Sequence, residues 1–256
     1  VGPWAHYFGD WMLDQLPTYV AATLSRALPP IPVLIDAGMP PTHRRSLELM
    51  LSGNSEMIEL PPFKIARVRR LWCAPSHKIN SAFLETDRWK WNYTAISPAR
   101  FAPVVDEIRR RVDKALSPGA GPHRVFLARR EALHRKLVNH TAIEAAAAAR
   151  GFAIVYPEDL DFLGQVCLVR NARHVIVPDG SALFLGYFAR PGTKFCILTH
   201  PLIFMMQTET ALLSGVEVTL FTGPYIRKKV KSPEESDYQI DESRFCAFLE
   251  DWLKAG

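Results

Sequence analysis

The sequence predicts an α/β protein made of two α/β halves, and three observations lead to this class. Between residues 124 and 221, short apolar runs alternate with segments of helical period, as in a parallel sheet covered by helices on both faces. Residues 1–117 follow a looser version of the same alternation. The stretch from Ser117 to Pro122 (SPGAGP) has the composition of a linker. We therefore expect one domain over residues 1–117 and another over 123–256, with the active crevice between them.

Apolar spacing and turn residues define the elements of the first half. Four apolar residues at helical spacing form the buried stripe of a first helix over residues 8–26: Leu13, Leu16, Val20 and Leu24. Pro17 should kink this helix after two turns. The following elements are a buried strand at 31–37, a helix capped by Thr42 and ending at Leu51, strand-like pieces at 57–60 and 64–72, a functional loop at 77–100, and an arginine-rich helix at 102–116.

The second half alternates regularly. Its expected elements are strand 124–128, helix 139–150, strand 152–156, helix 161–172, strand 174–178, helix 181–189, strand 194–199, helix 202–214 and strand 216–221. Gly151 and Gly215 stand just past two of these helices, at the position that favours glycine. A last helix starts at the cap Asp241 and repeats apolar residues at helical spacing: Phe245, Phe248, Leu249 and Trp252.

Composition limits the classes of function. The 256 residues are 48% hydrophobic and 22% charged, which is ordinary for a globular protein with a core. The net charge of +5 suits an anionic ligand or an anionic membrane surface but falls short of a nucleic-acid footprint. The densest basic run, Arg227 to Lys231, is either a solvated loop or a membrane contact. Since no signal peptide or membrane-spanning run occurs, we expect a cytoplasmic protein, peripheral at the inner membrane face.

The cysteines and histidines do not predict a metal site. No CxxC pair occurs, and the eight histidines form no cluster with metal-ligand spacing. The four cysteines lie far apart in apolar stretches, so we expect buried free thiols: Cys73, Cys167, Cys196 and Cys246.

A basic cluster follows the first strand of the second half. Arg129, Arg130 and Arg135 surround a helix start, where they are either surface charge or ligands of a phosphate, which arginine binds bidentately. Asn139 is either the N-cap of that helix or a donor to a ligand.

A second turn, Asp179-Gly180-Ser181, joins the strand at 174–178 to the next predicted helix. Gly180 allows close approach to the backbone, and the first N–H groups of the helix should point at an anion. A carboxylate at Asp179 would repel a diphosphate, so we expect it to meet a hydroxyl or to act as a base. The sequence contains neither GxGxxG nor GxxxxGK[ST], which argues against a nicotinamide-dependent oxidoreductase and a P-loop protein.

Two acidic residues on the first helix, Asp10 and Asp14, are four apart and hence lie on one face. Solvent exposure explains most such pairs, and Asp10 is also a candidate N-cap. Because Trp11 and the aromatic run His6 to Phe8 crowd the same end, one carboxylate is expected to have a raised pKa and to serve as a general base. Trp89 and Trp91 are either sugar-stacking residues or buried anchors.

These motifs, in this order, resemble the family 61 glycosyltransferases. The opening run from His6 to Pro17 is similar to the family's aromatic helix that ends in Leu-Pro. The remaining correspondences are Arg129, Arg135 and Asn139 for an Arg-x5-Arg-x3-Asn element, Gly151-Phe152, Pro157-Glu158, Gln165, Asp179-Gly180-Ser181-Ala182-Leu183 for a His-Gly-Ala-x-Leu element, and Ala189 to Gly192 for a turn. Asp10 and Asp179 stand where histidine is usual, and His140 where an acidic residue is common. An asparagine after Leu183 and a glutamate near Ile197 are missing.

The resemblance implies a GT-B-like arrangement of two Rossmann-like halves with a central cleft. It implies an inverting, metal-independent transferase that moves a sugar from a nucleotide donor to a glycan or glycoconjugate in surface polysaccharide synthesis. The expected donor ligands are Arg129, Arg130, Arg135, Asn139, Gln165, Gly180, Ser181, Ala182 and Leu183, and the expected catalytic residues are Asp10, Asp14 and Asp179. The alternative is a non-catalytic carbohydrate- or nucleotide-binding protein on the same scaffold. Neither reading includes a cofactor, a metal or nucleic acid.

Overall fold

A computed structural model describes most of the chain. The described residues are 6–26, 29, 31–51, 55–74, 79–80, 94–95, 98–117, 119–130, 134–201, 213–227 and 235–254. The chain divides into two compact units: unit 1 contains residues 1–117 and 161–163, and unit 2 contains residues 118–160 and 164–256. The predicted tryptophan pair Trp89 and Trp91, and nearly all of the predicted helix 202–214, lie outside the described residues.

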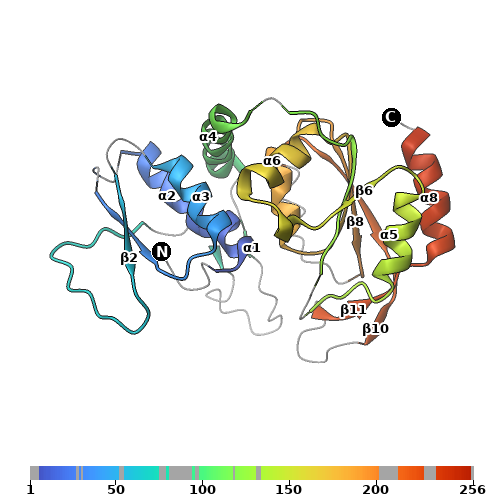
Figure 1. Cartoon of the computed structure of the whole chain (residues 1–256), viewed down its shortest axis with the longest axis horizontal. Helices are drawn as coiled ribbons and strands as arrows, with labels where there is room; N and C mark the ends of the chain where they lie inside the picture. The colour runs from blue at the N-terminus through green and yellow to red at the C-terminus, as the bar shows by residue number, and fades with distance from the viewer. Residues whose placement is uncertain are drawn as a thin grey trace. The chain divides into compact units, whose positions relative to one another are not determined.

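Unit 2 is built on a five-stranded parallel sheet (Figure 1), as the alternation of strands and helices predicts. Its strands are β5 (Arg124–Leu127), β6 (Ala153–Val155), β7 (His174–Pro178), β8 (Lys194–Thr199) and β9 (Glu217–Thr222). They lie in the order β6-β5-β7-β8-β9. The chain thus runs from β5 to β6 on one side and then returns to β7 on the other side of β5. The boundary between β5 and β7 is a topological switch point.

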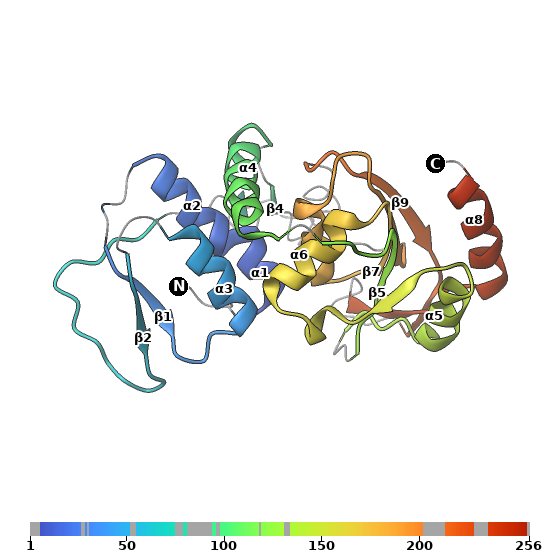
Figure 2. The same cartoon turned by 45° about the horizontal axis from the view of Figure 1, so that its top comes forward.

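Helices cover both faces of this sheet. Helix α6 (Phe162–Asn171) lies on one face, and α5 (His140–Ala148) and α8 (Glu242–Lys254) lie on the other in both views (Figures 1 and 2). Phe126 and Ile176 from the sheet pack with Phe245 and Leu249 of α8 in one fully buried cluster. Asp241 caps α8 as predicted, since its Oδ1 accepts from the backbone N–H of Arg244 at 2.8 Å.

The predicted helix 181–189 is instead a 3-10 helix, η4 (Ser181–Phe188). All residues from Leu183 to Phe188 are buried, so this element has no solvent-facing stripe. Two short strands precede the last helix α8: β10 (Tyr225–Arg227) and β11 (Asp237–Tyr238), which pair antiparallel. Glycine is required just before β10, because a Cβ on Gly223 would lie 1.8 Å from the carbonyl oxygen of Gln239.

Unit 1 opens with a continuous helical stretch of three parts: α1 (Phe8–Asp10), the π-helical turn η1 (Trp11–Gln15) and α2 (Leu16–Leu24). The N–H of Leu16 donates to the carbonyl of Trp11, five residues back, so the helix widens one residue before Pro17. Leu13, Leu16 and Val20 are buried as predicted, whereas Leu24 is exposed. The stripe therefore ends one turn earlier than the spacing suggests.

A βαβ unit follows, in which β1 (Val33–Asp36) and β2 (Met57–Leu60) pair in parallel on either side of α3 (Pro41–Met50) in the sequence. Thr42 does not cap α3, contrary to the prediction, because Pro40 holds the N-cap position and no side chain bonds there. The predicted strand at 64–72 is also wrong: the segment is irregular and exposed throughout. The short strands β3 (Ile79–Asn80) and β4 (Thr94–Ala95) pair antiparallel before α4 (Pro98–Ala115).

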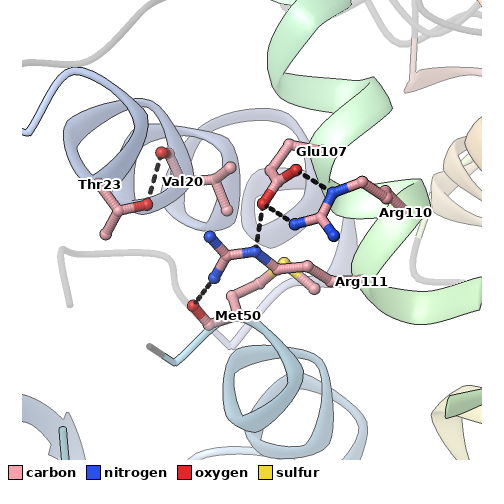
Figure 3. Close-up of polar contacts among 6 residues, drawn as sticks. All are labelled: Val20, Thr23, Met50, Glu107, Arg110 and Arg111. Carbon is pink, nitrogen blue, oxygen red and sulfur yellow. Dashed lines mark hydrogen bonds and ion pairs between the residues drawn. The ribbon is translucent and has the colours of Figure 1, made fainter. Parts of the chain in front are cut away.

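Side-chain hydrogen bonds fix the helices of unit 1. Glu107 on α4 accepts from Arg110 at 2.6 Å and from Arg111 at 2.6 Å, and Arg111 donates onward to the carbonyl of Met50 at the end of α3 (Figure 3). The indole of the buried Trp11 donates to Ser46 Oγ at 2.7 Å and stacks on His43. The first helical stretch and α4 are thereby each tied to α3.

The cysteines are free, but their burial differs from the prediction. Only Cys196 in β8 is buried, where desolvation raises the pKa of its thiol, and Cys73 is exposed in the irregular segment after β2. In the described part of the chain, no helix has the length and hydropathy to span a membrane.

Candidate functional site

The carboxyl ends of three neighbouring strands meet beside the switch point of unit 2. Arg129 follows β5, Asp179 follows β7, and Thr199 ends β8 with His200 directly after it. Since β5, β7 and β8 are parallel neighbours, these residues emerge at one edge of the sheet. In open α/β sheets this edge, at the switch point, is where ligands bind.

Asp179 is completely buried at the centre of this edge. Its Oδ2 accepts from Thr199 Oγ1 at 3.5 Å and lies 3.9 Å from Nε of Arg135. Burial raises the pKa of this carboxyl, while the charges of Arg135, His200 and Arg129 act in the opposite direction. A carboxylate enclosed in this way can orient the arginines beside it.

Arg129 lies against the backbone of Gly180. A Cβ at Gly180 would come within 3.3 Å of Nη1 of Arg129, so the glycine leaves room for the guanidinium. The same Nη1 donates to the carbonyl of His134 at 3.4 Å. Burial and the neighbouring charge of Arg135 lower the pKa of Arg129. Two guanidinium groups therefore share one carboxylate, which leaves an excess positive charge at the strand ends.

Arg135 adopts an uncommon backbone conformation. Its φ of 56° lies in the left-handed region, which costs an ordinary residue about 1–2 kcal/mol. The bond from its N–H to the carbonyl of Glu235 at 3.2 Å helps to hold this conformation. Only 16% of its side chain is exposed, and its Nε faces Asp179. The guanidinium of this residue with a left-handed backbone thus faces Asp179. We name the residues gathered at these strand ends the strand-end cluster: Arg129, Arg135, Asp179, Gly180, Thr199, His200 and Tyr238.

The tip of η4 completes this cluster. Gly180 occupies its N-cap position, and Leu183 donates its N–H back to the carbonyl of Gly180 at 3.1 Å. Leu183 is fully buried, whereas Ser181 and Ala182 are half-buried. The helix tip next to Arg129 adds the positive end of a backbone dipole.

Arg130 points to the other side of β5. It forms an ion pair with Asp159 in η3 (Pro157–Asp159), the turn after β6, and lies 4.3 Å from the centre of the Tyr156 ring. The two consecutive arginines after β5 thus lie beside different strands: Arg129 lies beside the residues that follow β7, and Arg130 beside the turn that follows β6. The structure does not bring Arg130 together with Asp179.

Asn139 and Gln165 hold backbone segments in place. The amide of Asn139 donates to the carbonyl of Ile240 at 2.7 Å and accepts from the N–H of Ile240 at 3.2 Å. Asn139 is the N-cap residue of α5, as one alternative predicted, but its side chain makes no cap bond. The buried Gln165 donates to the carbonyl of Pro157 at 2.8 Å. The side chains of both residues are thus engaged by the backbone of neighbouring segments.

Asp10 and Asp14 belong to unit 1. Both are half-buried, and Thr18 Oγ1 donates to Asp14 Oδ1 at 3.4 Å. Asp10 ends α1, whose N-cap is Tyr7, so the alternative that Asp10 is an N-cap is wrong. The ring of Trp11 between them turns into the core, while the two carboxylates flank or enter the π-helical turn. Such turns are frequent at functional sites.

Three further polar residues of the strand-end cluster were not predicted: Thr199, His200 and Tyr238, all fully buried. Tyr238 donates its hydroxyl to the carbonyl of Leu198 at 2.6 Å, and its ring meets His200 edge-on at 5.8 Å. Thr199 is the last residue of the buried strand β8 and His200 follows it directly, which resembles the signal that identified Asp179. Within the described residues, no group of three or more His, Cys, Asp or Glu side chains could hold a metal ion.

Comparison with known proteins places the chain in a family. A family model described as Glycosyltransferase 61 matches residues 8–196, which include Asp10, both clustered arginines and Asp179. No curated protein matches the chain. The match covers well over half of the chain, and the protein therefore belongs to glycosyltransferase family 61.

Proposed function

We propose that the protein is an inverting glycosyltransferase that moves a hexosyl or pentosyl group from a nucleotide donor, UDP-linked, to a hydroxyl of a glycan or glycoconjugate. The observation that carries the proposal is the meeting of Arg129 and Arg135 around Asp179 at the switch point of the unit 2 sheet. We further propose a GT-B-like arrangement, in which unit 2 holds the donor and unit 1 holds the acceptor.

In this mechanism the arginines stabilise the leaving diphosphate. Breakage of the bond between the anomeric carbon and the diphosphate oxygen leaves negative charge on the phosphates. Fixed guanidinium groups and the N–H groups at the tip of η4 can take up this charge without reorganisation. Asp179 orients the guanidinium groups from the buried side of the site. Its complete burial and its distance of 3.9 Å from Nε of Arg135 support this role. No step of the proposal requires a metal ion.

The acceptor hydroxyl must lose a proton as it attacks the anomeric carbon from the opposite face. We assign this proton to Asp10 or Asp14, which lie at the π-helical turn of unit 1. Asp10→Asn and Asp14→Asn should separate the two: the variant of the true base loses transfer activity by a factor of about 100 or more. If both variants keep the full sugar-transfer activity, the base is not a residue of this helix.

Arg135→Ala tests the donor site directly. Loss of one charged phosphate contact costs about 1.5–3 kcal/mol, so calorimetry should find UDP bound at least tenfold more weakly. Arg173→Ala is a matched control, because Arg173 is exposed just before β7, at the amino end of the strands, and its loss changes the net charge equally. Unchanged UDP affinity in Arg135→Ala, or equal weakening in both variants, would refute this site.

A non-catalytic carbohydrate- or nucleotide-binding protein is the second candidate. It is favoured by Asp179, which is enclosed where the family usually has histidine, and by the missing asparagine after Leu183. A panel of nucleotide sugars distinguishes the two functions. Transfer or donor hydrolysis supports the enzyme, and UDP binding without turnover of any donor supports the binding protein.

The proposed setting is surface polysaccharide synthesis in the cytoplasm, with peripheral contact at the inner face of the membrane. The basic run at 227–231, our sequence-based candidate for this contact, is described only at Arg227, which ends β10. The proposal does not include nucleic acid as a partner.

A further inference from the structure

The most exposed part of the described chain is the irregular segment that follows β2. We name residues 61–73 the basic-apolar segment; every one of them is exposed. Five of its large apolar residues are open to solvent, and Phe63 and Ile65 are fully so: Phe63, Ile65, Val68, Leu71 and Trp72. Scattered apolar side chains on a surface are ordinary, but five within ten consecutive residues indicate an interaction site.

The same segment carries one sign of charge. Four cations are interspersed with the apolar residues: Lys64, Arg67, Arg69 and Arg70. No acidic residue occurs from Pro61 to Ala74. Among the described residues, no ion pair joins these four cations to an acid. Elsewhere in unit 1, the exposed Arg45 and Arg110 form ion pairs with Glu48 and Glu107. The basic-apolar segment therefore presents uncompensated positive charge.

A turn projects the start of the segment. The N–H of Lys64 donates to the carbonyl of Pro61 at 3.2 Å, and Phe63 within this turn has a φ of 60°. A left-handed conformation is rare for a bulky residue, and here it accompanies a ring that contacts almost nothing. The turn thus holds Phe63 and its neighbour Ile65 outward, with a cation between them in the sequence.

This combination matches the chemistry of an anionic bilayer surface. Cations beside such a surface pair with lipid phosphates, while apolar side chains enter the boundary between headgroups and acyl chains, where tryptophan is also favoured. A soluble polyanion would satisfy the four cations but leave Phe63 and Ile65 in water. An apolar protein groove would bury these two but leave the cations without counter-charge.

We propose that the basic-apolar segment docks the protein on membranes that contain anionic phospholipid. This function goes beyond sugar transfer and involves no residue of the strand-end cluster. It also differs from the contact expected at 227–231, because it lies in unit 1 and combines cations with exposed apolar side chains.

Vesicle flotation with the whole chain tests the proposal. Vesicles of equal parts phosphatidylcholine and phosphatidylglycerol should carry the protein upward, and vesicles of phosphatidylcholine alone should not. Each cation near such a surface contributes about a fivefold factor in partition, so Lys64→Gln combined with R67Q, R69Q and R70Q should abolish flotation. The matched control is K114Q, R173Q, R244Q and K254Q, which removes the same charge from exposed positions elsewhere.

Apolar insertion is tested separately with Phe63→Ser and Ile65→Ser in one variant. This variant should lose at least tenfold in partition on anionic vesicles but bind immobilised heparin as the wild type does. Circular dichroism and the melting temperature should not change, since both side chains are exposed. Undiminished flotation of this variant or of the quadruple variant, equal flotation on neutral vesicles, or heparin binding without flotation would each overturn the proposal. UDP binding serves as an independent readout, so failure here leaves the donor site unaffected.

Discussion

Units 1 and 2 organise their polar residues in different ways. In unit 2, a parallel sheet brings residues separated by tens of positions, such as Arg129, Asp179 and Thr199, to one edge. In unit 1, the described strands pair only two by two, and polar residues such as Arg111, which is held by Glu107 on the same helix, link one helix to the next. In unit 2, the order of the strands therefore decides which polar residues meet. In unit 1, the position of each polar side chain depends on the helix that carries it.

The two units also differ in what shifts the pKa of their acidic side chains. Asp179 is enclosed between guanidinium groups, and burial raises its pKa. Glu107 is a more ordinary case, because Arg110 and Arg111 lower its pKa to about 2. Burial thus has the largest effect on the pKa of Asp179 in unit 2, whereas pairing with arginines has the largest effect on the pKa of Glu107 in unit 1.

The largest expected effect tests whether the unit 2 core supports its site. Phe245 is fully buried between α8 and the sheet, so Phe245→Ala should lower the free energy of unfolding by about 3–5 kcal/mol. Hydrogen exchange should locate the loss in the amides of β7 and β8. Phe63→Ala is the matched control, because this fully exposed ring in unit 1 should change stability by less than about 0.5 kcal/mol. Equal effects would contradict the difference between the two environments.

The fold of unit 2 could be predicted because both its faces are covered. Buried parallel strands are short apolar runs, and β7 and β8 occupy the predicted ranges 174–178 and 194–199. The same reasoning failed at residues 64–72, a short run of apolar and basic residues that looks like a strand. Residue types alone cannot indicate whether a neighbouring strand exists, and no described strand pairs with this segment.

The candidate site could be predicted only where it follows a strand. Arg129 and Asp179 were recognised as the polar residues that follow buried strands. Tyr238 enters the cluster through an isolated bridge to Leu137, a contact between segments about a hundred positions apart that no local pattern encodes. Arg130 follows the same strand as Arg129, yet its ion pair with Asp159 depends on the course of the chain after β6.

A smaller effect is expected for the ion pairs within helix α4 of unit 1. The pKa of Glu107 in the folded protein is about 2, below its ordinary 4.5, so its pairs with Arg110 and Arg111 stabilise the fold fully above about pH 4.5. This contribution is lost as the pH falls from about 4.5 to about 2. We expect about 1–2 kcal/mol, less than the whole shift implies, because Arg110 is 53% exposed and water screens the pair.

Glu107→Gln measures this contribution. In urea denaturation at neutral pH the variant should be about 1–2 kcal/mol less stable than the wild type, and the difference should shrink as the pH falls through the same window. Asp106→Asn on the same helix is the control, because its carboxylate is 73% exposed and lies 3.8 Å from Arg109. A difference that stays constant down to pH 2 would assign the effect of Glu107 to packing.

The smallest expected effect is that of Asp179→Asn on UDP affinity, and its sign distinguishes two roles of the carboxylate. If Asp179 orients Arg129 and Arg135, Asp179→Asn should weaken UDP binding about three- to tenfold, although it removes a negative carboxylate from the cluster. If the carboxylate merely repels phosphate, the same variant should bind UDP more tightly. Asp159→Asn frees the exposed Arg130 and changes the charge equally, so it serves as the matched control. Both variants lose one carboxylate, so their net charge changes equally. Weaker UDP binding in Asp179→Asn alone would therefore come from the lost orientation of the two arginines. Tighter UDP binding in both variants would instead identify net charge as the determinant of donor affinity.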